Sequence, residues 1–261
     1  MSNLSDLMPA GASGKTIEAT ATATIASKAP VILNSAGTVT EVGETATAES
    51  LGSPVELVAA TVAAYGQAVC YDSANDKLVA VYIKDSDSDV YATVGTITGT
   101  SVSWATPVAA VASTTADEEP QIVYDVNSGK VVIFFCKQDS SSYLYGVVGT
   151  VSGTTTSWET PVAANSYSSR YISATYNSGD NTTLVGYTYT SNSTRVIIGT
   201  VSGSTLTFAG DTEIAAGGNC EMMGIAYDTN ASAFAALHKN NSNQTYVRCG
   251  TISGSTITLG T

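Results

Sequence analysis

The chain has 261 residues, of which 12% are charged and 43% hydrophobic, and its formal net charge at pH 7 is −12. Only ten residues are Lys or Arg, and they are scattered singly, which excludes the basic patch that nucleic acid or an anionic membrane surface requires. No run of about 18 apolar residues occurs, so no membrane insertion is expected. The length is sufficient for a substantial hydrophobic core.

Residues 1–53 are predicted to form an N-terminal anchoring segment and a β-hairpin module. The start of this region holds three helix breakers, Pro9, Gly11 and Gly14. Its apolar residues, which are the candidates for anchoring to a partner's groove, are Leu4, Leu7 and Met8. A loose terminus is the alternative. The hairpin follows, with Ala29–Leu33 and Thr38–Val42 on either side of a turn at Asn34–Gly37.

A glycine-bounded pentapeptide returns four times in the rest of the chain, at intervals of about 51 residues. It reads Gly-Thr-Ile/Val-Thr/Ser-Gly, and its copies are Gly95–Gly99, Gly149–Gly153, Gly199–Gly203 and Gly250–Gly254. Self-similarity at this period is typical of propellers, solenoids and arrays. A repeat architecture over residues 54–261 is therefore predicted.

Other residues recur in the same phase. A Tyr before Asp or Asn precedes each pentapeptide, and an aromatic or leucine residue follows it. The first set is Tyr71, Tyr124, Tyr176 and Tyr227, and the second is Trp104, Trp158, Phe208 and Leu259. In each repeat an apolar run lies between the Tyr and the pentapeptide, and its continuous apolar character indicates burial on both faces.

Each repeat thus offers four short β segments separated by turn residues. We predict an all-β chain: an N-terminal β-hairpin module followed by about four four-stranded antiparallel repeats, arranged as in a β-propeller. The expected units are about 67–119, 120–170, 171–221 and 222–261. Leu51–Val55 resembles the last strand of a repeat, Trp104–Val108. Either four blades close the ring, or the chain is a piece of a longer protein.

Asp85, Asp87 and Asp89 alternate along the chain as the acids of a calcium loop do. The glycine and the distal glutamate of an EF-hand are missing, and the sister loops lack the acids. A solvated hairpin turn is the main interpretation, calcium is the alternative, and no other cofactor is expected.

The chain is predicted not to be an enzyme. Its single histidine, His238, lies in repeat phase with Tyr82, Phe135 and Tyr187, which indicates a packing position. Serine-triad chemistry has no other base. No pair of acids stands out for glycoside hydrolysis, and the chain has only three arginines.

The stretches Leu4–Lys15 and Ile25–Val42 are similar to the N-terminal region of virion proteins of marine tailed phages, of the tail-fibre or head-appendage type. The Tyr-Asp and Gly-Thr-Val-Ser-Gly repeats resemble the propeller-like parts of the same proteins. The resemblance implies a virion location, with the N-terminal region attached to other virion proteins and the repeats displayed for particle decoration or host attachment. We expect a homo-oligomer, with a host-surface glycan as a candidate ligand. The alternative is a lectin-like or glycan-cleaving propeller.

Overall fold

The structure is a computed structural model, and it describes residues 20–21, 23–25, 31–36, 38–41, 52–112, 116, 120–137, 142–189, 193–217, 220–240 and 242–260. The chain divides into two compact units, Met1–Leu51 and Gly52–Thr261. The anchoring candidates Leu4, Leu7 and Met8 lie outside the described residues. Among the described residues, no helix is long and apolar enough to cross a membrane.

The first unit contains the hairpin that its sequence predicts. Strands β2 (Val31–Leu33) and β3 (Thr38–Glu41) pair antiparallel, and the Asn34 amide donates to the Thr40 hydroxyl at 2.7 Å across the turn. A short strand, β1 (Thr20–Ala21), lies within the alternating stretch Thr16–Ile25 and adds to β3 in parallel, a pairing that the hairpin prediction does not include.

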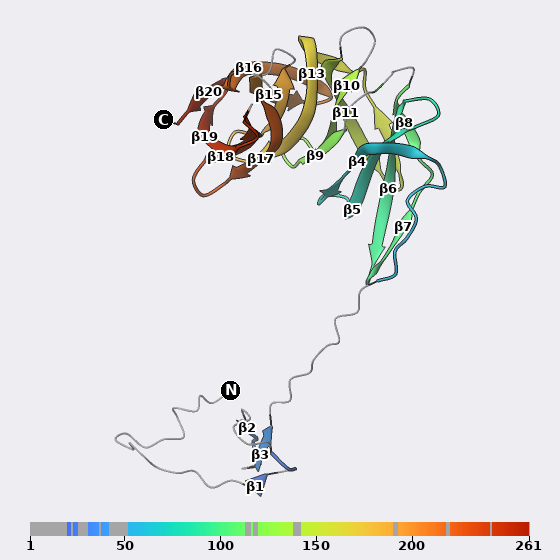
Figure 1. Cartoon of the computed structure of the whole chain (residues 1–261). Helices are drawn as coiled ribbons and strands as arrows, with labels where there is room; N and C mark the ends of the chain where they lie inside the picture. Colours follow the sequence, from blue (N-terminus) through green and yellow to red (C-terminus); the bar gives the residue numbers. More distant parts are fainter. Residues whose placement is uncertain are drawn as a thin grey trace. The chain divides into compact units, whose positions relative to one another are not determined.

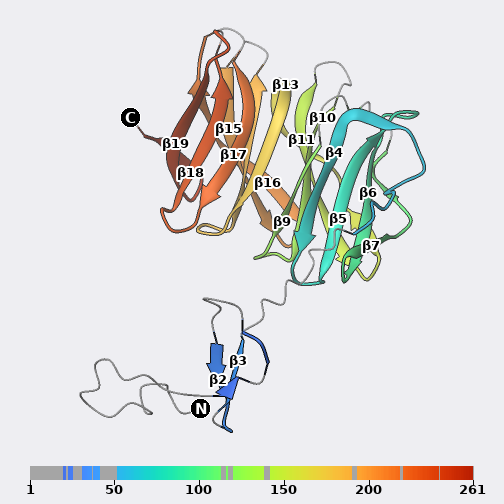
Figure 2. The same cartoon turned by 60° about the horizontal axis from the view of Figure 1, so that its bottom comes forward.

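The second unit consists of four groups of antiparallel strands, here called blades 1 to 4 (Figures 1 and 2). Blades 2 and 3 share one long strand and so form a single 8-stranded sheet. Blade 1 contains β4 (Val62–Asp72), β5 (Lys77–Lys84), β6 (Val90–Thr98), β7 (Ser101–Trp104) and β8 (Val108–Val111). Blade 2 contains β9 (Gln121–Asp125), β10 (Lys130–Lys137), β11 (Tyr143–Ser152), β12 (Thr155–Trp158) and the first part of β13 (Val162–Asn177). Blade 3 contains the rest of β13, β14 (Thr182–Tyr189), β15 (Ser193–Ser202) and β16 (Thr205–Ala215). Blade 4 contains β17 (Glu221–Asp228), β18 (Ala233–Lys239), β19 (Thr245–Ser253) and β20 (Thr256–Leu259).

The blades follow one another around an arc, as in a propeller. The first strands β4, β9, β13 and β17 contact one another in turn and form the inner side of the arc. No strand pairing joins blade 1 to blade 4 in the described part of the unit, so the arc is open. The predicted all-β, propeller-like class is confirmed.

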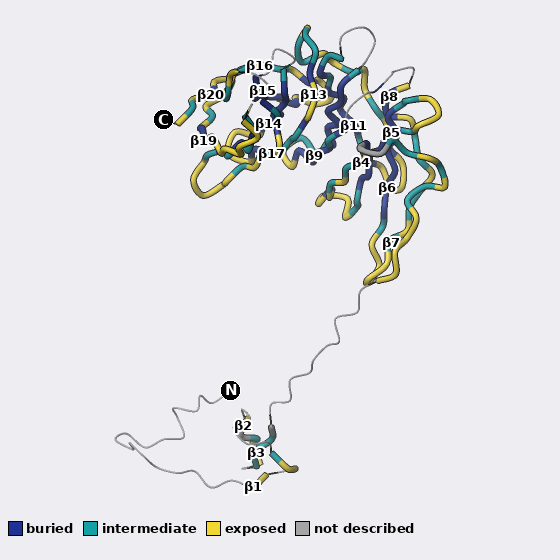
Figure 3. The backbone as a smooth tube through the Cα atoms, viewed as in Figure 1, coloured by how far each residue is buried: buried dark blue, intermediate teal, exposed yellow. Residues whose placement is uncertain are grey.

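Hydrophobic clusters lie between successive blades, because a four-stranded sheet cannot cover both of its own faces. The second strands β5, β10 and β14 are almost entirely buried, and they are among the dark strands in Figure 3. Phe134, for example, packs toward blade 3, and its neighbour Phe135 packs toward blade 1. The continuous apolar runs therefore have the two-sided cover that their sequence predicts.

The two glycines of the pentapeptide have different physical roles. The first lies opposite the aromatic residue of the fourth strand: Gly95 pairs with Trp104 and Gly149 with Trp158. The closing glycine has a φ of about +60° in all four copies and begins a two-residue hairpin loop, where type II′ turns require glycine. The residues in that position are Gly99, Gly153, Gly203 and Gly254.

The Asp or Asn that ends each inner strand organises the following turn. Its side-chain oxygen accepts hydrogen bonds from the backbone N–H groups two and three residues ahead, which is an Asx turn. These four residues are Asp72, Asp125, Asn177 and Asp228. The preceding tyrosine reaches the turn of the previous blade: the hydroxyl of Tyr176 accepts from the N–H of Asn127 at 3.3 Å. The Tyr-Asp repeat therefore joins neighbouring blades.

Candidate functional site

Each blade carries a cross-strand pair near the start of its third strand. In three blades the pair consists of two stacked rings with centroids 5.7 to 5.9 Å apart. These pairs are Tyr82–Tyr91, Phe135–Tyr145 and His238–Tyr246. Blade 3 has Tyr187 opposite Arg195 instead. A guanidinium group thus occupies a position where the fold elsewhere uses an aromatic ring.

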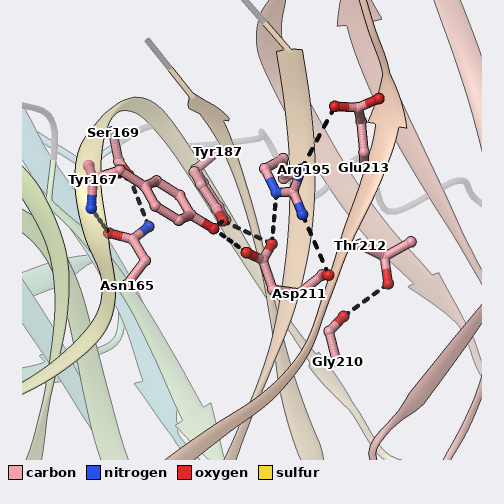
Figure 4. A network of polar contacts seen from close by, with 9 residues as sticks. All are labelled: Asn165, Tyr167, Ser169, Tyr187, Arg195, Gly210, Asp211, Thr212 and Glu213. Carbon is pink, nitrogen blue, oxygen red and sulfur yellow. Dashed lines mark hydrogen bonds and ion pairs between the residues drawn. The ribbon is translucent and has the colours of Figure 1, made fainter. Parts of the chain in front are cut away.

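Arg195 is held by an acid from the neighbouring strand (Figure 4). Its Nε donates to Asp211 Oδ1 at 2.9 Å, and its Nη1 lies 3.5 Å from Glu213 Oε2. β16 reaches this position because it bends at Gly210, where φ is +66°, and then pairs again with the start of β15. The side chains of Arg195 and Asp211 are 21% and 25% exposed, so this ion pair is largely withdrawn from water.

Two tyrosines complete the group that is here called the Arg195–Asp211 cluster, which consists of Tyr167, Tyr187, Arg195, Asp211 and Glu213. The Tyr187 hydroxyl donates to Asp211 Oδ1 at 2.8 Å, and the Tyr167 hydroxyl donates to Asp211 Oδ2. The two hydroxyl oxygens are 3.1 Å apart. Tyr167 comes from the first part of β13, which pairs with blade 2, so the cluster lies where blades 2 and 3 meet.

The backbone before Tyr167 is fixed by Asn165. Its side-chain oxygen accepts from the N–H of Leu144 at 3.3 Å, and its amide nitrogen donates to the Ser169 hydroxyl at 2.9 Å. The Tyr167 ring also packs edge-on against Tyr189, with centroids 4.6 Å apart. Tyr167 is therefore held in place from both sides before any ligand arrives.

Electrostatics in the cluster follow from partial burial. Burial raises the pKa of Tyr187, and the hydrogen bonds with Tyr167 and Asp211 raise it further, so the phenol stays protonated. Burial alone would lower the pKa of Arg195, but the hydrogen bond and charge of Asp211 outweigh it and raise the pKa. The guanidinium stays charged. Glu213 is the outermost acid, with 45% of its side chain exposed.

The structure places the three calcium candidates in the hairpin turn between β5 and β6. Asp87 accepts from Lys84 Nζ at 2.8 Å, and this hydrogen bond lowers the pKa of Asp87. Within the described ranges, no three His, Cys, Asp or Glu side chains gather into a group that could hold a metal ion. Asp85, Asp87 and Asp89 are thus not brought together as ligands, and a calcium site there stays a prediction.

His238 occupies the packing position that its repeat phase predicts. It is buried and stacks on Tyr246 with an interplanar angle of 22°. Burial lowers its pKa, and nearby Arg248 lowers it further. Beside it lies a cavity of about 550 Å³, whose lining includes Ile214, Tyr246 and Arg248.

Sequence reasoning missed the Arg195–Asp211 cluster. The signal available was Arg195 itself, a charged residue in phase with Tyr91, Tyr145 and Tyr246. Its partner Asp211 follows a bend that breaks the repeat, and Tyr167 belongs to the previous blade's edge. Neither contact is visible from repeat spacing.

No family model matches the chain, and no curated protein matches it. Among solved structures, the BP39L lectin from Burkholderia pseudomallei is similar over 81% of this chain and 59% of its own, with a TM-score of 0.63 and 13% sequence identity. A Trypanosoma rangeli sialidase in complex with 2,3-difluorosialic acid is similar over 89% of this chain and 40% of its own, with a TM-score of 0.45 and 13% identity. The chain thus spans less than two thirds of either structure. At this identity the similarity shows the propeller-like fold alone.

One prediction is corrected by these comparisons. The sequence analysis predicts that the chain is not an enzyme, but one of the structures with a similar fold is a sialidase captured as a covalent intermediate. The single histidine and the lack of a distinctive pair of acids in the sequence therefore do not justify the exclusion, and it is withdrawn.

Proposed function

We propose that the chain binds glycans where blades 2 and 3 meet, and that the Arg195–Asp211 cluster forms the contact site. One observation carries the proposal: blade 3 replaces a stacked aromatic pair by a largely buried ion pair with two tyrosines. The other three blades pack with rings at this position, so the repeat does not require these charges. Withdrawing charges from water has a free-energy cost, and a binding role accounts for retaining them.

The cluster has the groups that a sugar ring needs. Sugar hydroxyls both donate and accept hydrogen bonds, and guanidinium and carboxylate groups make the strongest bonds to them. Tyrosine rings offer apolar area with a polar edge. Glu213 is exposed enough to accept from a ligand, and Tyr167 is fixed by Asn165, so little order has to be gained on binding. The lectin with a similar fold makes this function compatible with the architecture.

The charge balance favours a neutral glycan. The cluster has two carboxylates, Asp211 and Glu213, for one guanidinium, and the chain as a whole has a formal charge of −12. A sialylated or sulfated sugar would meet repulsion from both sources.

A glycan array probed with the whole chain tests the proposal, followed by calorimetry on the best ligand. Glu213→Gln and Arg195→Lys should each weaken binding at least about tenfold. Glu213→Gln replaces a charged acceptor by a neutral amide, and Arg195→Lys removes the planar guanidinium group. Glu159→Gln changes an exposed glutamate outside the cluster and should bind normally. Thermal unfolding of each variant shows whether it is folded.

Two results would count against a binding site here. One is an array without a reproducible ligand, and the other is a ligand whose affinity neither cluster variant changes. Release of sugar from the bound glycan would reassign the cluster from binding to cleavage.

The biological setting is a separate proposal. Its support is the N-terminal resemblance to tailed-phage virion proteins, which implies a virion location, attachment to other virion proteins through Leu4, Leu7 and Met8, and a host-surface glycan as the ligand. Particles assembled with a chain that starts at Val55 test it. If that chain is incorporated normally, the anchor lies elsewhere.

A further inference from the structure

We propose that Tyr189 and Tyr167 form an aromatic platform beside the Arg195–Asp211 cluster, and that this platform stacks on the second unit of a neutral oligosaccharide whose first unit binds the cluster. The two residues are called the tyrosine platform below. The inference rests on the proposed glycan-binding function and deepens it, because it names the class of ligand. That class has at least two linked sugar rings, and the second ring has an uninterrupted C–H face.

Tyr189 stands at a position where the repeat elsewhere has a polar side chain. The equivalent residues, each two positions after the ring or histidine of the second strand's cross-strand pair, are Lys84, Lys137 and Asn240. In blades 1 and 2 the lysine Nζ lies over the ring of the third strand, 5.2 Å from the Tyr91 centroid and 5.8 Å from the Tyr145 centroid. Blade 3 exchanges the two groups, because its third strand has the cation, Arg195. Packing of the repeat therefore does not require a tyrosine at position 189.

The tyrosine platform lies on the same face of blade 3 as the cluster. Tyr189 is two positions beyond Tyr187 on β14, so the two side chains are about 7 Å apart along one face of the strand. Tyr189 and Tyr167 both pack against the hydrophobic residues between blades 2 and 3, and their ring centroids are 4.6 Å apart. The platform thus continues the cluster toward the end of β14.

The tyrosine platform is partly open to solvent. Tyr167 and Tyr189 are both half-buried, whereas Tyr187 is fully buried. In the described part of the chain, no lysine or arginine lies over either platform ring, in contrast to the rings of blades 1 and 2. The exposed ring surface is therefore left for an apolar partner, and covering it releases water at a gain in free energy.

A polar cluster next to an apolar platform matches two neighbouring units of a sugar chain. A sugar ring has hydroxyls around its edge and C–H groups on its faces, and a hydroxyl points out of a face only when it is axial. The cluster can bond to the hydroxyl edge of one unit while the platform covers a C–H face of the next. Tyr167 is held at both ends, by Asn165 at its backbone N–H and by Asp211 at its hydroxyl, so the platform exists before the ligand arrives.

Calorimetry with ligands of two lengths tests the platform. The probes are the terminal disaccharide of the strongest neutral glycan on the array and the methyl glycoside of its terminal unit. The wild type should bind the disaccharide at least about tenfold more tightly than the methyl glycoside. Equal affinities would overturn the inference and leave the proposed function standing. If neither probe binds, the glycan site itself is wrong, and the inference fails with it.

Tyr189→Asn introduces the residue that blade 4 has at this position, and it should remove the gain from the second unit. The affinity for the disaccharide should fall at least about tenfold, and the affinity for the methyl glycoside should stay within about threefold. Tyr189→Phe keeps the ring and is the matched control, because the Tyr189 hydroxyl has no hydrogen-bond partner among the described residues. It should bind both probes normally.

The pattern over the two probes separates the platform from the cluster. Glu213→Gln should weaken both probes, because it changes the cluster that both of them contact. Equal losses of both probes in Tyr189→Asn would show that Tyr189 only holds Tyr167 in place, and the inference would then be wrong.

Saturation-transfer NMR on the wild-type chain is independent of whether a variant folds. Irradiation of the aromatic ring protons should saturate most strongly the C–H protons on one face of the second unit of the disaccharide. An epimer of that unit with an axial hydroxyl on the same face should bind about as weakly as the methyl glycoside. Saturation confined to the first unit, or an epimer that binds as tightly as the disaccharide, would overturn the stacking.

Discussion

Gly149 and Trp158 are cross-strand partners in blade 2, and the indole ring of Trp158 fills the space in which a side chain on residue 149 would stand. A Cβ built on Gly149 would lie 2.3 Å from the ring. The same relationship holds for Gly95 and Trp104, at 2.6 Å. The glycine that opens the pentapeptide is thus required by the aromatic residue that follows it.

Gly149→Ala should therefore destabilise the unit by about 1–3 kcal/mol, the usual cost of overpacking a well-filled site. Denaturant unfolding of the wild type and variant measures it. Gly224→Ala is the control, since nothing lies within 4 Å of a Cβ there and its φ is not positive. Equal losses of stability for the two changes would show that contact with the ring does not explain the glycine at position 149.

Trp158→Ala should cost about 3–5 kcal/mol, as other large-to-small changes of packed aromatic residues do. Trp158 packs against the cluster between blades 1 and 2, and its ring nitrogen donates to Thr156 at 3.0 Å. A loss below about 1 kcal/mol would place the ring on the surface. In the double variant, Gly149→Ala should cost less on the Trp158→Ala background than it does alone, because the ring that would contact the new methyl group is gone.

The Asx turns give a third prediction. Asp125 is fully buried and accepts from the N–H groups of Asn127 and Ser128, so Asp125→Ala should cost about 1–3 kcal/mol by leaving both donors without an acceptor. Asp125→Asn should hardly change the free energy of unfolding, because Asn177 accepts the equivalent hydrogen bonds in blade 3. Asp228→Ala, in the exposed turn of blade 4, should cost less since water can replace the carboxylate. Equal losses at positions 125 and 228 would contradict this account.

Stability should fall in mild acid through His238. Burial lowers the pKa of His238 from its ordinary value of 6.5. As the pH falls through 6.5, the unfolded chain takes up a proton before the folded chain does, so the free energy of unfolding decreases until the lower folded pKa is reached. His238→Phe removes the chain's only histidine. Unfolding at pH 7.5 and 5.5 should show a larger loss for the wild type than for this variant, and equal losses would exclude His238 as the cause.

Much of the fold could be predicted because its signals are local. The closing glycine needs a positive φ, the Asx residue needs only the two N–H groups after it, and continuous apolar runs need cover on both faces. Each requirement is met within one hairpin or between adjacent strands, so it recurs at the repeat period. The stacked position of His238 follows in the same way from Tyr82, Phe135 and Tyr187.

The candidate site could not be predicted, because its contacts are long-range. Tyr167 and Asp211 are 44 residues apart and come from the edges of different blades. The bend at Gly210 that brings Asp211 back to Arg195 interrupts the repeat instead of continuing it. The anchoring residues Leu4, Leu7 and Met8 lie outside the described residues, so their role stays a prediction.

The sequence by itself determined the repeat, its four β segments and the residues that make each turn, because backbone sterics and hydrogen bonding act over a few residues. Only the tertiary structure decided that the arc is open, that Val69, Tyr71 and Val247 are exposed at its ends, and that Arg195 meets Asp211. Those outcomes depend on how one sheet packs against the next, which the spacing of residues along a single strand does not encode.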